Sequence, residues 1–131
     1  MEKRKKILLI DDEENFCFFA KRNLEQRGEF EVIATTDGGK GILLAKTENP
    51  DLILLDVAMP RISGPDVADE LVQDARTRHI PYIFLTAIVT EEELGIDAPS
   101  EIGGHNFISK PVPMDKLIRC IKMVLEKGAA A

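Results

Sequence analysis

The sequence predicts an α/β fold: a single doubly wound domain in which helices cover both faces of a five-stranded parallel sheet. Short runs rich in Ile, Leu and Val alternate along the chain with segments of helical period. Such runs are typical of strands buried on both faces. The length of 131 residues is close to the usual size of one domain. With right-handed crossovers and no internal repeat, one doubly wound sheet is the economical arrangement.

The apolar runs predict the positions of the strands, and apolar residues at helical spacing predict the helices between them. We expect strands at 7–10, 30–34, 52–55, 80–85 and 105–108. The core-facing helical residues should be Phe16, Phe19, Ala20 and Leu24; Ile42, Leu43 and Ala45; Val67, Ala68, Leu71 and Val72; and Met114, Leu117, Ile118, Ile121, Val124 and Leu125. Thr36 or Asp37 is a plausible cap for the second helix. Glycines and Pro99 interrupt the pattern between 88 and 104, which leaves about two helical turns around 91–96.

Composition excludes several classes of protein. The net charge of -6 argues against a general nucleic-acid binder, which needs a basic surface. No apolar run approaches the roughly 20 residues of a membrane-spanning helix, so we expect a soluble, cytoplasmic protein. Cys17 and Cys120 are too few and too far apart for a disulfide framework or a zinc site. Residues 1–4 are expected to form a basic tail, 5–127 the domain, and 128–131 a C-terminal tail or an added end.

Polar residues gather where the predicted strands end. Asp56 ends the run of four apolar residues at 52–55, and open α/β sheets bind their ligands at this edge. One such aspartate is most often only a cap or turn residue. The full set comprises Asp11, Asp12, Asp56, Thr86 and Lys110. Clustered carboxylates repel one another unless a cation holds them ionised, and Mg²⁺ prefers oxygen ligands. The set therefore suits phosphoryl transfer to an aspartate nucleophile.

These residues resemble the receiver domain of two-component response regulators, over about 5–127. The resemblance is carried by Asp11-Asp12, by Asp56 with Pro60 and Gly64, by Thr86-Ala87 and by Lys110-Pro111. It implies a flavodoxin-like sheet with strand order 2-1-3-4-5, an order that is known for one member of this family. It also implies a signalling switch rather than a turnover enzyme, with a histidine kinase or phosphotransferase as phosphodonor and Mg²⁺ as cofactor. The resemblance does not decide the oligomeric state, and a phosphorylation-dependent dimer is left open.

The resemblance assigns a role to each matching position. Asp56 should accept the phosphoryl group, and Asp12, Asp56, the carbonyl of Ala58 and, through water, Asp11 should hold the metal. Thr86 and Lys110 should contact the phosphoryl group, and Pro111 should follow a cis peptide bond. Phe107 occupies the aromatic switch position but has no hydroxyl. Ala58 and Ile88 flank the approach of the hydrolytic water, and because neither can orient it, we expect slow autodephosphorylation.

Three other interpretations remain to be compared with this one. A receiver-like module could act without phosphorylation. Haloacid-dehalogenase-type phosphatases also use an aspartate nucleophile, but they have a second aspartate where this chain has Ala58. A P-loop is suggested by Gly38-Gly39-Lys40-Gly41, yet no Ser or Thr follows Lys40. No output region follows Lys127, so we expect output through another protein or through chain beyond this sequence.

Overall fold

A parallel sheet forms the centre of the molecule in the computed structural model, which describes residues 4–87, 100–102, 105–110 and 112–130. The strands are β1 (Lys5–Ile10), β2 (Phe30–Thr35), β3 (Leu52–Asp56), β4 (Tyr82–Thr86), β5 (Ser100–Ile102) and β6 (His105–Ser109). The helices are α1 (Glu14–Gln26), α2 (Gly38–Glu48), α3 (Gly64–Gln73) and α5 (Met114–Ala130). Within these residues, no helix combines the length and apolar composition that crossing a membrane requires.

The sheet has the order β2-β1-β3-β4-β6-β5. Its first five members pair in parallel, and the fifth predicted strand is β6, so the predicted order 2-1-3-4-5 is confirmed. The short β5 is an addition that the sequence did not predict; it pairs antiparallel with β6 at the edge of the sheet. A strand of three residues beside glycines is too short to show an apolar period.

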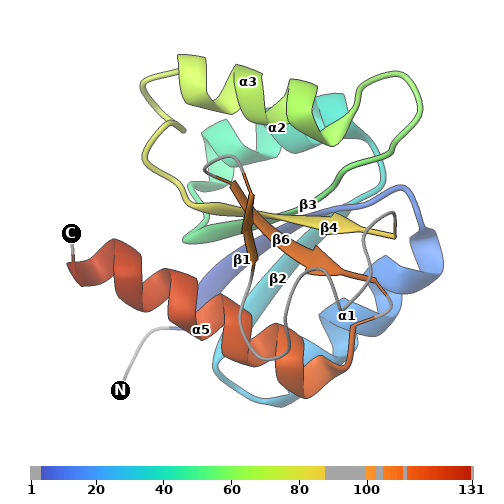
Figure 1. Cartoon of the computed structure of the whole chain (residues 1–131), viewed down its shortest axis with the longest axis vertical. Coiled ribbons are helices and arrows are strands. Elements are labelled where there is room, and N and C mark those ends of the chain that lie inside the picture. The colour runs from blue at the N-terminus through green and yellow to red at the C-terminus, as the bar shows by residue number, and fades with distance from the viewer. Residues whose placement is uncertain (1–3, 88–99, 103–104, 111, 131) are drawn as a thin grey trace.

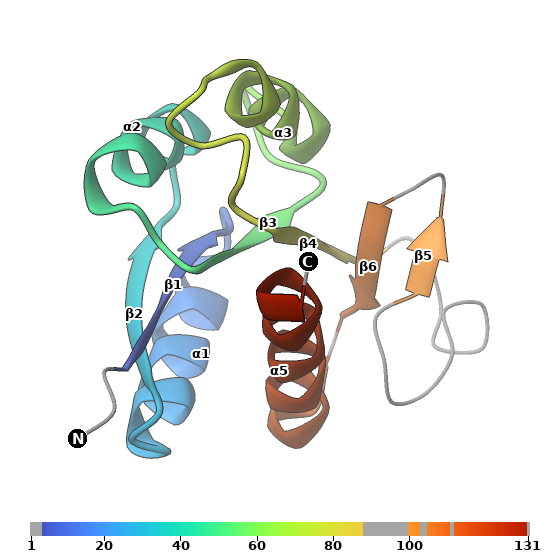
Figure 2. The same cartoon turned by 90° about the vertical axis from the view of Figure 1, so that its left-hand side faces the viewer.

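Two apolar layers hold the helices against the sheet. Successive β1 side chains alternate between them: Ile7 and Leu9 pack with α1 and α5, whereas Leu8 and Ile10 pack with α2 and α3. Figure 2 shows these two helix pairs on opposite faces of the sheet. Because both faces are covered, all four of these β1 residues are completely buried. The continuous apolar runs of the sequence follow from this arrangement.

Local signals account for the helix boundaries. The carboxylate of Asp37 accepts a hydrogen bond from the N–H of Lys40 at 3.0 Å, which confirms Asp37 as the cap of α2. Ser63 caps α3 in the same way through the N–H of Asp66, at 3.2 Å. Pro65 follows in the first turn of α3, where its missing N–H costs no hydrogen bond.

Some details of the sequence prediction are wrong. Strand β4 begins at Tyr82 rather than at Ile80, because the N–H of Ile80 closes a turn onto the carbonyl of Thr77. Phe19, Leu43 and Val72 were expected in the core, but their exposed fractions are 55%, 59% and 51%. Helical spacing brings each of them only to the border of the apolar stripe. The helix expected around 91–96 lies outside the described residues.

Candidate functional site

The sheet brings the predicted site residues to one edge. Asp56 is the last residue of β3, Thr86 is the last residue of β4, and Asp11 directly follows β1. The N–H of Asp11 donates to the carbonyl of Thr35 at 3.1 Å, and the N–H of Lys110 donates to the carbonyl of Thr86 at 2.8 Å. The backbone ladder therefore continues past the strand ends and fixes the starting point of each side chain.

Three carboxylates converge at this edge. Ligand oxygens of Asp11, Asp12 and Asp56 all lie within 4.8 Å of one another. Asp11 is completely buried and Asp56 is 6% exposed, whereas Asp12 faces solvent. Burial and the repulsion between neighbouring carboxylates both oppose the charged form of a buried carboxyl group, which displaces its pKa upward.

The pKa of the Asp56 carboxyl shows this displacement. Burial, a side-chain hydrogen bond with Asp12 and the negative charge of Asp11 raise the pKa of Asp56 to about 7. Burial also raises the pKa of Asp11, although hydrogen bonds from Lys110 and from the N–H of Glu13 partly offset it. Without a compensating cation, the Asp56 carboxyl therefore retains its proton up to near-neutral pH.

The donor set fits a hard divalent cation. All three candidate ligands are carboxylate oxygens, one of them is open to solvent, and their repulsion would be relieved by positive charge. Mg²⁺ takes only one or two protein carboxylates and keeps several waters, and the exposed side of Asp12 leaves space for them. The residues that are present therefore suit Mg²⁺ better than a zinc or copper site, which would call for His or Cys ligands.

Lys110 supplies the positive charge of the site. Its Nζ donates to Asp11 Oδ2 at 2.9 Å and to Glu13 Oε1 at 2.6 Å, and its side chain is only 8% exposed. Burial opposes its charge, but the hydrogen bonds to Asp11 and Glu13 outweigh burial and raise the pKa of Lys110. The ammonium therefore remains charged over the whole neutral range.

Sequence reasoning missed two neighbours of this lysine. Glu13 contacts it directly, and the ring centroid of Phe16 lies 4.7 Å from Nζ, a cation–π distance. The signal for Glu13 was present, because it is the third acidic residue in the run that follows β1. The sequence does not predict where the Glu13 side chain points, because this depends on the folded backbone.

Gly64 lets α3 begin directly against the end of β3, where Asp56 stands. A Cβ at this position would overlap the carbonyl oxygen of Asp56 and lie 2.9 Å from the Cα of Val57. The N–H of Gly64 donates to the carbonyl of Val57 at 2.8 Å. Any larger residue would displace the backbone of Asp56 and Val57 at the end of β3, which gives a physical reason for a glycine at this position.

The remaining predicted residues lie around this centre. Ala58 is exposed on the loop after β3, and Thr86 is 2% exposed. Phe107 is half-buried in β6, with its ring centroid 5.2 Å from that of Phe84. Ile88 and Pro111 lie outside the described residues, so the predictions of a water shield and of a cis peptide bond stay predictions.

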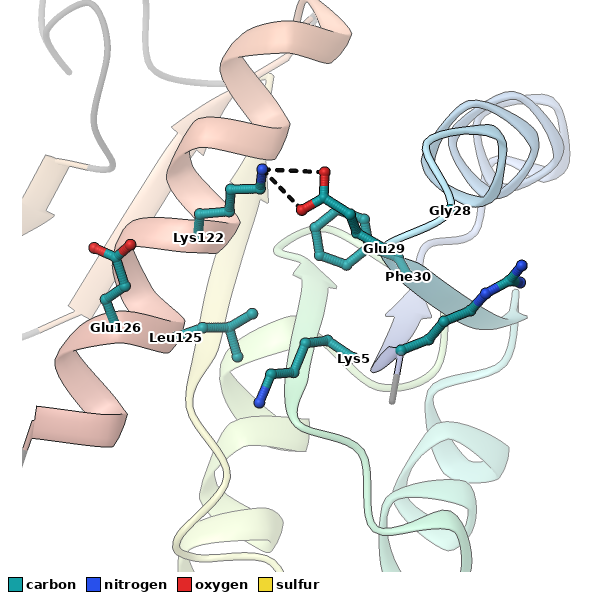
Figure 3. Close-up of a pocket in the computed structure, with 8 residues that line it drawn as sticks. Lys5, Gly28, Glu29, Phe30, Lys122, Leu125 and Glu126 are labelled. Atoms are coloured by element: carbon teal, nitrogen blue, oxygen red, sulfur yellow. Dashed lines mark hydrogen bonds and ion pairs between the residues drawn. The ribbon is translucent and has the colours of Figure 1, made fainter. Parts of the chain in front are cut away.

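Two cavities differ in their relation to the carboxylates. One of about 380 Å³ lies beside them and is lined by Glu13, Phe16, Phe19, Ala87, Lys110 and Val112. The other, of about 420 Å³, lies where β1 and β2 begin and is lined by Arg4, Lys5, Gly28, Glu29, Phe30, Lys122, Leu125 and Glu126. Figure 3 shows the Lys122–Glu29 ion pair across that second cavity, at 2.9 Å. Since Asp11 and Asp56 stand at the opposite strand ends, the second cavity is not part of their site.

Comparisons with known proteins agree with this geometry. The family model of the response regulator receiver domain matches residues 7–122. The chain is 35% identical over 127 residues to the alkaline phosphatase synthesis transcriptional regulatory protein PhoP of Bacillus subtilis, covering 97% of this chain and 51% of PhoP. It is 32% identical over 120 residues to protein PilH of Pseudomonas aeruginosa, covering 92% of this chain and 97% of PilH. The chain thus spans about half of the first relative and nearly all of the second.

Solved structures give the same result. A CheY-like response regulator receiver domain protein from Methanospirillum hungatei superposes with a TM-score of 0.79, at 25% identity, and covers 98% of both chains. The receiver domain of sensor histidine kinase PA1611 from Pseudomonas aeruginosa has a TM-score of 0.77, at 22% identity, over 95% of this chain and 99% of that one. The second structure has a magnesium ion coordinated in its active site cleft. On its sequence, its fold and the position of its acidic cluster, this chain belongs to the receiver domains of two-component response regulators.

Proposed function

We propose that this receiver domain is a switch controlled by phosphorylation of Asp56. The observation that carries the proposal is the position of Asp56: it is buried at a strand end, beside two further aspartates and within the field of Lys110. Receiver domains interact with histidine kinases or phosphotransferases, so we propose a phosphohistidine of such a partner as donor. We expect this phosphotransfer to take place in the cytoplasm.

The transfer moves one phosphoryl group between two side chains. A carboxylate oxygen of Asp56 attacks the phosphorus, the O–P bond forms and the N–P bond of the donor breaks. The electron pair of that bond stays on the imidazole, which takes up a proton from solvent. Asp56 has to be ionised to attack, and its pKa of about 7 means that neutralising charge at the site favours the reactive form.

Mg²⁺ is the cofactor that we propose for this charge. Asp12, Asp56 and the carbonyl of Ala58 would hold it directly, and Asp11 would hold it through water. When bound, it would neutralise charge on the carboxylates and on the phosphoryl oxygens. The magnesium reported for the PA1611 receiver domain supports this assignment.

Lys110 and Thr86 should orient the transferred group. The ammonium of Lys110 remains charged at neutral pH and can donate to one phosphoryl oxygen. Thr86 stands at the end of the neighbouring strand, two strands away from β1, where its hydroxyl can serve another oxygen. Both side chains are buried, so water competes little for these donors.

The output should be a changed surface rather than a released product. Phe107 lies on β6 against Phe84, half-buried, and an inward movement on phosphorylation would alter the surface near β6 and α5. Because Ala58 cannot orient a water molecule, the acyl phosphate on Asp56 should persist. The rate at which Ala58→Asn loses phosphate, compared with the rate for the parent, measures this effect. We further propose that residues 5–127 form the receiver domain.

Incubation with acetyl phosphate and Mg²⁺ tests the proposal. The intact mass should rise by one phosphoryl group in the parent and should stay unchanged in Asp56→Asn, because an amide oxygen is a poor nucleophile. Asp69→Asn, on the exposed face of α3, makes the same chemical change away from the site and should label like the parent. Full labelling of Asp56→Asn, or none of the parent, would contradict the proposal.

A further inference from the structure

Lys110 is held by two carboxylates that differ in their freedom to leave it. Asp11 accepts one hydrogen bond from Nζ and has a completely buried side chain, whereas Glu13 accepts another and is 62% exposed. The Asp11 carboxylate is fixed further by the N–H of Glu13, which donates to its Oδ1 at 2.9 Å. Asp11 is therefore a permanent partner of Lys110, and Glu13 is the partner that can turn away into water.

Glu13 is not needed elsewhere for local structure. It stands at the N-terminal boundary of α1, but its side chain makes no capping hydrogen bond to the helix. The backbone N–H of Cys17 is satisfied by the carbonyl of Glu13, not by its side chain. The carboxylate of Glu13 is thus directed to Lys110 rather than to the start of the helix, although a capping role is common for acidic residues at this position.

An incoming phosphoryl group competes for the same ammonium. Lys110 can neutralise a phosphoryl oxygen on Asp56 only by directing an N–H to it. Two of its three N–H groups already donate to Asp11 and Glu13. The phosphoryl group also brings negative charge close to Glu13, and like charges at short range repel. Both effects favour separation of the Glu13 carboxylate from Lys110 when Asp56 is phosphorylated.

We propose that Glu13 is a positioning residue that holds Lys110 in the resting arrangement and is displaced from it by the phosphoryl group. This inference rests on the proposed phosphorylation of Asp56 and adds a determinant of its extent. Glu13 stabilises the unphosphorylated state relative to the phosphorylated one, so its removal favours phosphorylation. The size of the effect is limited, because a contact with a largely exposed carboxylate is weak.

The test compares Glu13→Gln with the parent at saturating Mg²⁺, with acetyl phosphate as donor. Glu13→Gln should phosphorylate faster and lose phosphate more slowly, with a combined gain on the order of threefold in the phosphorylated fraction. Glu14→Gln removes the same charge from the next position, which is exposed, and should match the parent. Glu13→Gln behaving like Glu14→Gln would overturn the inference.

A second variant separates contact from simple repulsion. Glu13→Asp keeps the charge but shortens the side chain by one methylene, so the 2.6 Å contact with Nζ is lost. If the contact positions Lys110, Glu13→Asp should also phosphorylate faster than the parent; a rate equal to the parent's would assign the effect to repulsion alone and overturn the inference. Thermal unfolding of each variant checks that the fold is intact.

The two proposals fail in distinguishable ways. If the parent takes up no phosphoryl group at all, the phosphorylation of Asp56 is refuted and the Glu13 comparison has no basis. If the parent is labelled on Asp56 and the Glu13 variants match it, the switch stands and only the role of Glu13 is refuted.

Discussion

Two requirements oppose each other at Asp56: the residue is buried, and the proposed phosphorylation requires its carboxyl group to be ionised. Burial, the hydrogen bond with Asp12 and the charge of Asp11 raise its pKa to about 7. A carboxyl with a raised pKa in the folded state makes folding less favourable once it ionises. Without a cation, the site should therefore cost stability at neutral pH.

The pH dependence of unfolding in metal-free buffer tests this cost. An aspartate in the unfolded chain ionises near pH 3.9, whereas Asp56 in the folded chain ionises at about 7. Between these values the folded state binds more protons, so stability should fall as pH rises from about 4 to 7, by an amount on the order of 1–4 kcal/mol. Asp56→Asn should lose this part of the slope and be more stable than the parent at pH 7.5.

Chemical denaturation at several pH values in the presence of a chelator gives the measurement. Asp69→Asn controls for the loss of one negative charge at an exposed position. A parent and an Asp56→Asn variant with the same slope between pH 4 and 7.5 would show that Asp56 ionises normally.

The sequence placed the main site residues but not all of their contacts. Asp11, Asp56 and Thr86 could be predicted because strand ends meet at one edge whatever the details of packing. Glu13 and Phe16 could not, since their contacts with Lys110 depend on how α1 leaves β1. No repeating pattern in a sequence predicts where a side chain points at a strand–helix junction.

Edge strand β2 shows how one helix can protect a sheet. Among the strands that the structure describes, β2 pairs only with β1, and the outer backbone groups of such an edge strand can pair with another chain. On that side the N–H of Val32 donates to Glu25 Oε2 at 3.1 Å, and Lys21 Nζ donates to the carbonyl of Val32 at 2.8 Å. Two side chains of α1, one turn apart, thus occupy both outward backbone groups of a central β2 residue.

Removing both side chains should expose this edge. The double variant Lys21→Met and Glu25→Met should lose about 1–3 kcal/mol of stability, because two backbone groups lose their partners. It should also self-associate at lower protein concentration than the parent does. Sedimentation velocity and thermal unfolding measure the two effects.

A matched pair on the same helix controls for added methionines. Arg22→Met and Gln26→Met change exposed residues with the same spacing on α1. Equal self-association of the two double variants would show that the Lys21 and Glu25 contacts do not protect β2.

Helices and strands with a clear hydrophobic pattern were predictable from the sequence, whereas a short strand and a boundary next to a proline were not. Strand β3 is buried throughout, and its apolar run is unmistakable. The start of β4 was missed because Ile80 is apolar and buried, yet it belongs to a turn before Pro81. Burial and strand pairing are separate properties, and an apolar run reports only burial.

Across the whole molecule, the acidic cluster links metal binding to folding. Strands β1 and β3 are neighbours in the sheet but are separated by α1, β2 and α2 in the chain. Figure 1 shows the sheet in which β1 and β3 lie next to each other. Asp12 follows β1 and Asp56 ends β3, so the two carboxylates are brought together only when the sheet forms. A ligand that binds the native state alone stabilises it, by about 1.4 kcal/mol for each tenfold rise in concentration above the dissociation constant.

Thermal unfolding at increasing Mg²⁺ concentration should show this linkage. The parent should gain stability with each increment, and Asp12→Ala should not, because it would lack one of the proposed direct ligands. The variant can start from a higher stability without metal, since one repulsive carboxylate is gone. A magnesium dependence equal to the parent's in Asp12→Ala would remove Asp12 from the metal site.

The most direct measurement is to locate the phosphoryl group itself. After incubation with acetyl phosphate and Mg²⁺, borohydride reduction converts an aspartyl phosphate into homoserine, and peptide mass spectrometry identifies the position. The proposed switch predicts homoserine at position 56, dependent on both donor and Mg²⁺, with Asp11 and Asp12 unchanged. Reduction at Asp12 instead of Asp56, or at no carboxyl group of the chain, would contradict it.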